Sequence, residues 1–389
     1  MTVSPHSRRT LLLAFTLSAF GLGSCSKKSD SSSEGAPATS VAAASAEKKG
    51  GDLTVGFIYV GPKDDYGYNQ AHAEGAKAVA RMPGVKIREE EKVPESMEVQ
   101  KTMESMINLD QAKLVFPTSF GYFDPHILKL ADKYKETTFL HCGGLYTEGK
   151  HPANVGSYFG YIDEAQYVAG VVAGLTTKTG KLGFIAAKPI PQVLRNVNAF
   201  TLGARSVNPK AVTKVIFTGD WSLPVKEAEA ANSLADQGVD VVTSHVDSPK
   251  VIVETAERRG IFSSGYHASQ AALAPKGYLT GAEWNWAKVY EDYVNKVKAG
   301  EKWEHLVRGG FKEGYIKMSA YGAPVSDDAK KQADAAKAAL TAGTLTIFKG
   351  PLKDNKGKEI LPEGKQYGQR DIELEKMDYL VDGVEGSTS

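Results

Sequence analysis

From Asp52 onward, the chain alternates between short apolar runs rich in β-branched residues and segments with helical periodicity. The predicted strands are 53–60, 85–90, 113–117, 137–142, 155–160, 181–187, 212–218, 239–244, 261–265 and 278–283. The predicted helices are 69–81, 96–108, 124–134, 164–176, 192–205, 223–237, 249–259 and 287–299. Since such alternation implies parallel strands joined by right-handed crossovers, the sequence predicts an α/β fold.

These strand–helix units are too many for one regular open sheet, and the pattern breaks between 160 and 165. Residues 158–163 are the predicted crossing to a second sheet, which begins at Lys181. In the helix 96–108, apolar side chains at Val99, Met103, Met106 and Ile107 form a stripe that we expect to be core. The sequence therefore predicts two similar halves with a cleft between them.

The chain changes character beyond Gly300. Residues 309–320 predict an irregular strand, and 327–342 predict an exposed helix rich in alanine and lysine. A late hairpin is expected to pair 344–350 with 357–361 around Asp354-Asn355-Lys356-Gly357. The polar residues that follow show no clear pattern.

Residues 1–25 have the pattern of an export signal. Arg8 and Arg9 precede an apolar stretch, 11–22, that is shorter than the ~20 residues of a membrane-spanning helix. Leu22-Gly23-Ser24-Cys25 resembles the lipobox of bacterial lipoproteins, in which the cysteine is lipidated. An ordinary cleaved signal is the alternative, and Ser7-Arg8-Arg9 loosely matches a twin-arginine signal. Residues 26–51 have few large apolar side chains and are a predicted flexible tether.

Charge and cysteine content exclude some classes of protein. There are 47 basic and 46 acidic side chains, without a basic stripe, so we expect no nucleic-acid partner. If Cys25 carries lipid, Cys142 is the one cysteine left, and no internal disulfide can form. Cys142 ends an apolar run and is a predicted buried, inert thiol.

Sequence signatures of enzymes are weak or missing. Residues 174–181 (GLTTKTGK) resemble a phosphate-binding loop, but Leu182 replaces the Ser/Thr and the segment follows a helix pattern. The eight histidines show no metal-binding spacing, and no G-x-S-x-G elbow is present. We therefore expect no enzyme, no cofactor and no metal.

Polar and aromatic residues instead gather where the predicted strands end. They are Tyr66, Tyr68, Asn69, Gln70, Ser119, Phe120, Tyr122, His141, Lys188, Arg195, Asn198, Trp221, His245, Asp247, Tyr266, His267, Glu283, Trp284 and Asn285. The carboxyl ends of parallel strands share one edge of a sheet, so we expect these residues to face the cleft. Taken singly, several have structural explanations: Trp221 as a surface aromatic, Asp247 as a helix cap, His245 as a buried histidine, and Tyr122 and Phe120 as lid packing over the cleft floor.

Taken together, these residues favour a flat, uncharged ligand that forms hydrogen bonds. Two aromatics from opposite lobes can sandwich a planar ring, each stack contributing about 1–3 kcal/mol. A carboxylate such as Asp247 can accept from a ring N–H, and an amide such as Asn69 can both donate and accept.

The order and spacing of several motifs resemble the basic membrane protein (BMP) family of lipoproteins. The motifs are 55–58 (VGFI), 65–70 (DYGYNQ), 74–75 (EG), 160–170 (GYIDEAQYVAG), 183–191 (GFIAAKPIP), 199–203 (AFTLG) and 238–242 (GVDVV). Members are substrate-binding proteins of ABC importers and are related to purine nucleoside receptor lipoproteins.

The resemblance implies a type I periplasmic-binding fold, with two Rossmann-like lobes joined by three crossings. It implies lobe 1 at 52–160 and 283–306, lobe 2 at 161–282 and 307–345, and a C-terminal extension at 346–389. It also implies a purine ligand, a permease partner in the inner membrane, a monomer, and anchoring through Cys25 on the periplasmic or extracytoplasmic face.

Site residues carry over position by position. Tyr68 stands where the family has a stacking Phe, with Asn69 beside it, and Trp221 falls in the segment of the opposing aromatic. His245 and Asp247 fall in a second-lobe loop that reaches the ligand. Phe120, His141, Asn198 and Trp284 complete the predicted ligand-binding set.

Two departures from the family favour a free nucleobase such as adenine over a nucleoside. His141 replaces an Asp that holds ribose, and the 265–269 loop lacks an expected Asp. The alternatives are a receptor for another small solute such as a sugar-like signal, a sensor for a membrane signalling partner, and an enzyme such as a nucleoside hydrolase.

Overall fold

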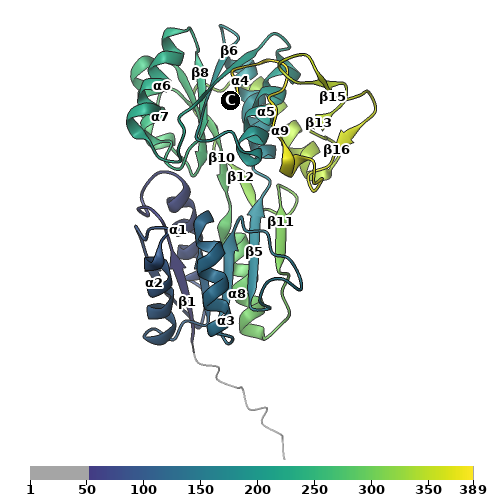
Figure 1. The fold of residues 1–389 in the computed structure, drawn as a ribbon. Coiled ribbons are helices and arrows are strands. Elements are labelled where there is room, and N and C mark those ends of the chain that lie inside the picture. Colours follow the sequence, from purple (N-terminus) through teal and green to yellow (C-terminus); the bar gives the residue numbers. More distant parts are fainter. Residues whose placement is uncertain (1–51, 389) are drawn as a thin grey trace, which may run out of the picture. The chain divides into compact units, whose positions relative to one another are not determined.

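The computed structural model describes residues 52–388. The expected export signal, the lipid anchor at Cys25 and the tether at 26–51 lie outside the described residues. Figure 1 shows the fold of the described chain. Among these residues, no helix combines the length and the apolar character needed to cross a bilayer.

Lobe 1 is built on a parallel sheet with strand order β11-β5-β4-β3-β1-β2. Its strands are β1 (Leu53–Ile58), β2 (Val85–Glu90), β3 (Leu114–Pro117), β4 (Thr138–Cys142), β5 (Val155–Gly160) and β11 (Leu306–Gly309). Its helices are α1 (Tyr68–Val79), α2 (Met97–Asn108), η1 (Phe120–Tyr122), η2 (Phe123–Ile127), α3 (Leu128–Lys133) and α8 (Trp286–Ala299). Because β11 pairs with β5, lobe 1 runs to Gly309, beyond the expected boundary at 306.

Alternate residues of the strands supply two cores in lobe 1. Val55 and Phe57 of β1 belong to the cluster that includes α1 and α8, whereas Ile58 belongs to the cluster under α2 and α3. The predicted stripe of α2 is confirmed as core at Val99, Met103 and Met106, which are 0%, 0% and 2% exposed. Ile107 is only partly buried.

Lobe 2 is built on a second sheet with strand order β12-β10-β9-β8-β6-β7-β17, in which only β12 runs antiparallel. Its strands are β6 (Lys181–Ala186), β7 (Val212–Phe217), β8 (Val241–His245), β9 (Phe262–His267), β10 (Tyr278–Trp284), β12 (Ile316–Met318) and β17 (Val384–Glu385). Its helices are α4 (Asp163–Thr176), α5 (Pro191–Val207), α6 (Pro224–Asp236), α7 (Lys250–Arg259), η3 (Ala271–Leu273), α9 (Asp327–Ala342) and η4 (Leu374–Lys376).

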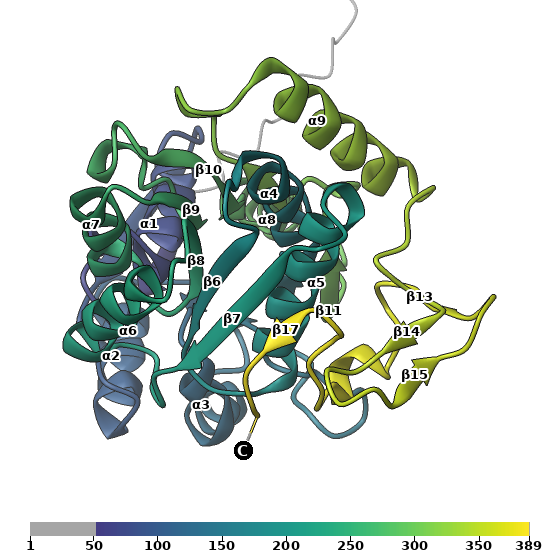
Figure 2. The ribbon, with the colours of Figure 1, turned by 90° about the horizontal axis from the view of Figure 1, so that it is seen from above.

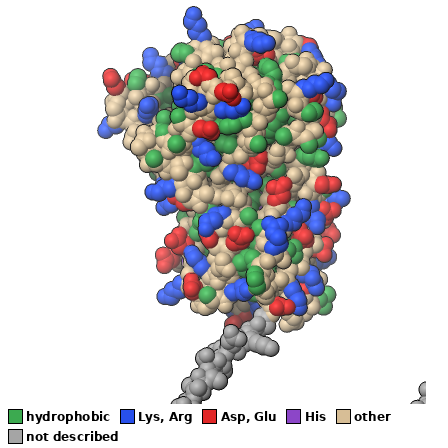
Figure 3. All heavy atoms as spheres, turned by 180° about the vertical axis from the view of Figure 1, so that it is seen from behind, with side chains coloured by type: hydrophobic (Ala, Val, Ile, Leu, Met, Phe, Trp, Pro, Cys, Tyr) green, Lys and Arg blue, Asp and Glu red, His purple; other side chains and the backbone are tan. Residues whose placement is uncertain are grey.

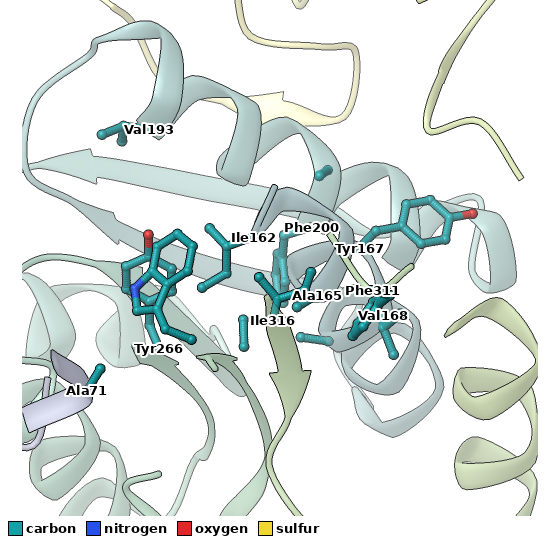
Figure 4. Packing of buried hydrophobic residues seen from close by; sticks show 14 of the residues in the cluster. Ala71, Ile162, Ala165, Tyr167, Val168, Val193, Phe200, Tyr266, Phe311 and Ile316 are labelled. Carbon is teal, nitrogen blue, oxygen red and sulfur yellow. The ribbon is translucent and has the colours of Figure 1, made fainter. Parts of the chain in front are cut away.

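Helices cover both faces of the second sheet, as Figure 2 shows, with α6 and α7 on one face and α4 and α5 on the other. The α4–α5 pair packs closely because of two glycines: a Cβ on Gly170 would lie 2.1 Å from the carbonyl oxygen of Phe200, and one on Gly203 would lie 2.0 Å from that of Tyr167. Figure 4 shows Ala165 of α4 and Phe200 of α5 among the buried residues of the core, together with Ile162.

The C-terminal extension is built into lobe 2. The expected turn at Asp354–Gly357 is present, but the expected pairing of 344–350 with 357–361 is wrong, because β14 (Leu352–Lys353) pairs with β15 (Glu359–Leu361). β13 (Phe348–Lys349) instead pairs with β16 (Gln366–Tyr367). β17 adds an edge strand beside β7, and four apolar residues of the extension are at most 1% exposed: Leu374, Met377, Leu380 and Val381.

The first and second sheets are connected at three places in the chain, between β5 and α4, between β10 and α8, and between β11 and β12. The predicted fold class, with two Rossmann-like lobes and three crossings, is therefore confirmed. Cys142 is also buried and free, as predicted, and burial raises the pKa of its thiol to about 12.

Candidate functional site

The loop between β1 and α1 is organised by Asp65. Its Oδ1 accepts from the backbone N–H groups of Gly67 (2.8 Å) and Gln70 (3.0 Å). Its Oδ2 accepts from the backbone N–H (3.1 Å) and the side-chain amide (2.8 Å) of Asn69. These bonds satisfy N–H groups at the start of α1 and fix the loop, in which Tyr66 has a φ of 55°.

The predicted polar reader Asn69 is part of the same loop. Its Oδ1 accepts from the N–H of Gly61 at 3.1 Å while its Nδ2 donates to Asp65. The side chain is only 2% exposed. Asn69 therefore shapes the loop through both ends of its amide group.

Tyr68 begins α1 and is partly buried. Its hydroxyl donates to the carbonyl oxygen of Thr118 at 2.6 Å. Its ring meets the rings of His72 and His267 edge-on, with centroids 4.6 and 5.5 Å apart. The ring is thus held by contacts with both lobes.

Direct hydrogen bonds join this loop to lobe 2, and we call them the interlobe contact. The N–H of Tyr68 donates to the carbonyl oxygen of Asp247 at 2.8 Å. Ser248 Oγ donates to the carbonyl oxygen of Asp65 at 2.6 Å, and Gln270 Nε2 donates to that of Tyr66 at 2.5 Å. Gly67 permits this approach, because a Cβ there would lie 1.9 Å from the Asp247 carbonyl oxygen.

Asp247 also connects to Trp221, the second predicted aromatic. The N–H of Asp247 donates to the carbonyl oxygen of Trp221 at 2.8 Å. The Trp221 ring is partly buried, and Lys188 Nζ lies 5.6 Å from its centre. The main chain of Asp247 therefore links the Tyr68 and Trp221 positions, which come from different lobes.

The carboxylate of Asp247 has no hydrogen-bond partner among residues 52–388. Burial raises its pKa to about 8, and nearby carboxylates add to the shift. These carboxylates belong to Asp65, Glu95, Glu227 and Asp220. A partly buried, unpaired carboxyl beside the interlobe contact can donate a hydrogen bond when neutral and accept one when charged.

A stack of buried rings continues from Tyr68. Trp284 Nε1 donates to His267 Nδ1 at 2.7 Å, and Trp284 stacks on Trp286 with ring centroids 4.7 Å apart. Trp286 in turn stacks on His72 at 5.2 Å. Trp284 is 4% exposed, so the structure places this predicted site residue within the stack. Burial lowers the pKa values of His72 and His267 well below the ordinary range, which keeps both rings neutral.

The polar side-chain atoms of His141 and Asn198 form hydrogen bonds with neighbouring segments of the chain. His141 Nε2 donates to the Ser119 carbonyl oxygen at 2.7 Å, and its Nδ1 accepts from Gly144 N–H at 3.0 Å. Asn198 Nδ2 donates to the Tyr379 carbonyl oxygen at 2.9 Å, and its Oδ1 accepts from Val381 N–H at 2.9 Å. Asn198 therefore holds the C-terminal extension.

Phe120 is not packed over a cleft floor, because its side chain is 65% exposed. It lies in η1, where the N–H of Gly121 donates to Glu95 Oε1 at 2.8 Å. The structural explanation proposed from sequence for Phe120 is therefore wrong.

The structure also reveals a charged cluster that sequence reasoning did not find. Arg195 is 5% exposed and donates to Asp163 (3.2 Å), Glu375 (3.1 Å) and Gln369 (2.8 Å). Gln369 also donates to Glu164, whose pKa burial raises to about 7. Two of these partners come from the extension, more than 170 positions along the chain, so no local sequence signal could identify them.

His245 lies near this cluster. Together with Asn196 and Tyr266 it lines a hollow beside the crossing at 159–163. His245 is 8% exposed, and burial lowers its pKa to about 3. In the described part of the chain, no group of three or more His, Cys, Asp or Glu side chains is arranged to hold a metal ion.

Two α/β lobes joined by three crossings define the type I periplasmic-binding-protein fold. The chain belongs to the family of PnrA-like ABC transporter substrate-binding proteins, whose model matches residues 53–347. Members of this family are substrate-binding proteins of ABC transporters. The C-terminal extension lies almost entirely beyond the matched residues.

Two relatives are similar over most of their length. A purine-binding protein of Brucella abortus is 36% identical over 345 residues, covering 88% of this chain and 95% of the relative. A putative ABC transporter glucose-binding protein of Haloferax volcanii is 30% identical over 338 residues, covering 87% and 82%.

Solved structures are similar in fold. An ABC transporter solute-binding protein from Conexibacter woesei has a TM-score of 0.64 at 22% identity and covers 75% of this chain and 97% of its own. A transcriptional activator of the comK gene from Bacillus halodurans has a TM-score of 0.66 at 21% identity, covering 75% and 99%. Since these proteins differ in role, the fold alone does not select a ligand.

Proposed function

We propose that this chain is a lipid-anchored extracytoplasmic receptor that delivers a purine, preferentially a free nucleobase such as adenine, to an ABC permease. The observation that carries the proposal is the arrangement around Asp247. Its main chain binds both Tyr68 N–H and the Trp221 carbonyl oxygen, and its carboxyl group has no partner among residues 52–388. Two aromatics and one free polar reader at a shared loop suit a planar ring with hydrogen-bonding edges.

The purine relative of Brucella abortus supports this ligand class, since it shares 36% identity across almost its full length. The unusual histidines support the nucleobase over the nucleoside. Both ring nitrogens of His141 are bonded to the main chain, and His267 is bonded to Val246 and Trp284. Neither side chain has a free acceptor for ribose hydroxyls.

The mixed surface supports a small-molecule ligand over a nucleic acid. Figure 3 shows Lys and Arg side chains interspersed with Asp and Glu on the face it draws. With a formal charge of +1, the chain lacks the excess of positive charge that phosphate backbones attract. We propose that it acts as a monomer.

The experiment is calorimetric titration of the purified chain with adenine, adenosine, guanosine and glucose. We expect adenine to bind with the highest affinity. Much tighter binding of adenosine would contradict the nucleobase preference, and glucose binding without any purine binding would overturn the purine proposal. Mass spectrometry of the solute that co-purifies with the protein is an independent check.

A sugar is the second candidate ligand, because the relative from Haloferax volcanii is named as a putative glucose-binding protein. A sensor role is distinguished by its partner: cross-linking of the ligand-bound chain in membranes should capture a permease and not a signalling protein. The anchor is tested by fractionation, since Cys25→Ala should release the protein from membranes.

A further inference from the structure

The hollow beside the crossing at 159–163 is lined in part by buried polar groups from lobe 2. Its cavity volume is about 20 Å³, which holds one group the size of a water molecule. Asn196 of α5, His245 of β8 and Tyr266 of β9 line it, and they are 2%, 8% and 0% exposed. These side chains also form hydrogen bonds with one another.

The chemistry of Asn196 determines which atoms donate in this network. Asn196 Nδ2 lies 2.8 Å from His245 Nδ1 and 3.1 Å from Tyr266 Oη. Since an amide nitrogen only donates, His245 Nδ1 must accept, and Tyr266 Oη accepts the second amide hydrogen.

The tautomer of His245 follows from this assignment. A neutral imidazole that accepts at Nδ1 carries its proton on Nε2. His245 Nε2 lies 3.2 Å from Tyr266 Oη, so it donates there as well. Burial keeps the ring neutral, because it lowers the pKa of His245 to about 3.

The Tyr266 hydroxyl therefore accepts two hydrogen bonds, and neither one uses its own proton. Among residues 52–388, the hydrogen-bond partners of Tyr266 Oη are Asn196 Nδ2 and His245 Nε2, and both of them donate. The hydroxyl proton of Tyr266 therefore has no acceptor in this part of the chain. A phenol has a single proton to donate, and burial without an acceptor costs free energy.

We propose that the Tyr266 hydroxyl donates this proton to an acceptor atom of the bound ligand and thereby selects ligands with an unprotonated ring nitrogen or a carbonyl oxygen at that position. This inference rests on the proposed purine function and adds a specificity-determining residue to it.

The backbone of Tyr266 is positioned by the interlobe contact. Gln270 accepts from Tyr266 N–H at 3.0 Å and donates to the Tyr266 carbonyl oxygen at 2.8 Å. The same Gln270 side chain donates to Tyr66 of lobe 1. The donor is thus fixed in place by a residue that also bridges the two lobes.

The test combines a protein variant with ligand analogues. Binding of adenine and of deaza-adenines, each lacking one ring nitrogen, is measured by calorimetry for the full chain and for Tyr266→Phe. We expect Tyr266→Phe to weaken adenine binding about tenfold, the equivalent of one hydrogen bond. One deaza-adenine should bind the unaltered protein about tenfold more weakly than adenine does. The same analogue and adenine should bind Tyr266→Phe with equal affinity, because the analogue and the substitution remove the same hydrogen bond.

Tyr293→Phe is the matched control. The Tyr293 hydroxyl donates to the Glu304 carbonyl oxygen at 3.0 Å, within lobe 1, so its removal should leave the affinity unchanged. Asn196→Asp is a second variant: its carboxylate would accept the Tyr266 proton, so adenine binding should weaken as it does in Tyr266→Phe.

Three outcomes distinguish a failure of this inference from a failure of the proposed purine function. Equal affinity of Tyr266→Phe and the unaltered protein for adenine overturns the inference and leaves the purine function standing. If, for every deaza analogue, the loss of affinity caused by the analogue and the loss caused by Tyr266→Phe multiply, Tyr266 affects binding only through the protein structure and does not contact the ligand. If the unaltered protein binds no purine, the proposed function fails, and the inference fails with it.

Discussion

At the residue scale, two substitutions of Tyr68 should separate its contribution to ligand binding from its contribution to the stability of the fold. Tyr68→Ala should weaken ligand binding by about 1–3 kcal/mol, because the ring is removed. Tyr68→Phe should retain most of the affinity but destabilise the fold by about 1 kcal/mol, since Thr118 loses the hydroxyl that donates to it. Calorimetry measures the first effect and urea unfolding the second. Unchanged binding by Tyr68→Ala would show that the ring does not contact the ligand.

Asp247 makes stability depend on pH. Burial and four nearby carboxylates raise its pKa from 3.8 to about 8 in the folded state. Between these two pKa values the folded protein holds a proton that the unfolded chain has released, so stability falls as the pH rises from about 4 to about 8. Asp247→Asn cannot titrate and should lose this slope. Melting temperatures near pH 5 and about pH 9 should therefore differ less in the variant, by a few degrees.

Asp132→Asn, at an exposed position of α3, serves as the control and should melt with the slope of the unaltered protein. A slope that is unchanged in Asp247→Asn would assign the pH dependence to other groups.

Sequence reasoning identified residue types better than it identified their partners. Tyr68, Trp221 and Asp247 could be selected because they follow strands, and the structure brings their main chains together. Asn69 and His141 were selected on the same grounds, but their polar atoms bond to Asp65 and to nearby main chain. A buried polar group must find a partner, and that partner is known only once the loop has folded.

At the element scale, periodicity predicted long elements well. The ranges 85–90 and 327–342 coincide with β2 and α9, because an amphipathic pattern and a capping Ser326 mark them. The extension was not predictable in this way. β13, β14, β16 and β17 each have two residues, and a segment of two residues is too short to show a periodic pattern of apolar side chains.

Substitution of Asn198 tests how much the C-terminal extension contributes to stability. Asn198→Ala removes the partner of Tyr379 and of Val381 N–H, both of which lie against lobe 2. We expect a loss of about 1–3 kcal/mol in the free energy of unfolding, the cost of leaving buried main-chain groups unpaired. Ligand affinity should stay within about twofold, since the side chain faces the extension. A large loss of affinity without a loss of stability would place Asn198 at the ligand.

At the scale of the whole molecule, Gly67 controls the approach of the lobes. In Gly67→Ala, the new methyl group would lie 1.9 Å from the Asp247 carbonyl oxygen, so the interlobe contact cannot form as it stands. We expect a larger radius of gyration by X-ray scattering and ligand binding weakened about tenfold or more, because fewer molecules reach the closed state.

Gly368→Ala is the matched control, because a Cβ at Gly368 meets nothing within 4 Å. It should leave both measurements unchanged. A Gly67→Ala protein that binds and scatters like the control would show that closure does not need this contact.

The interlobe contact has one further property. Tyr68 provides its N–H, while Asp65, Tyr66 and Asp247 provide carbonyl oxygens, so all the lobe 1 groups in it belong to the main chain. Main-chain groups persist through nearly every substitution. As long as Gly67 and the two lobe 2 donors, Ser248 and Gln270, are kept, descendants of this chain can therefore exchange the side chains that recognise a ligand without rebuilding the contact by which the lobes meet.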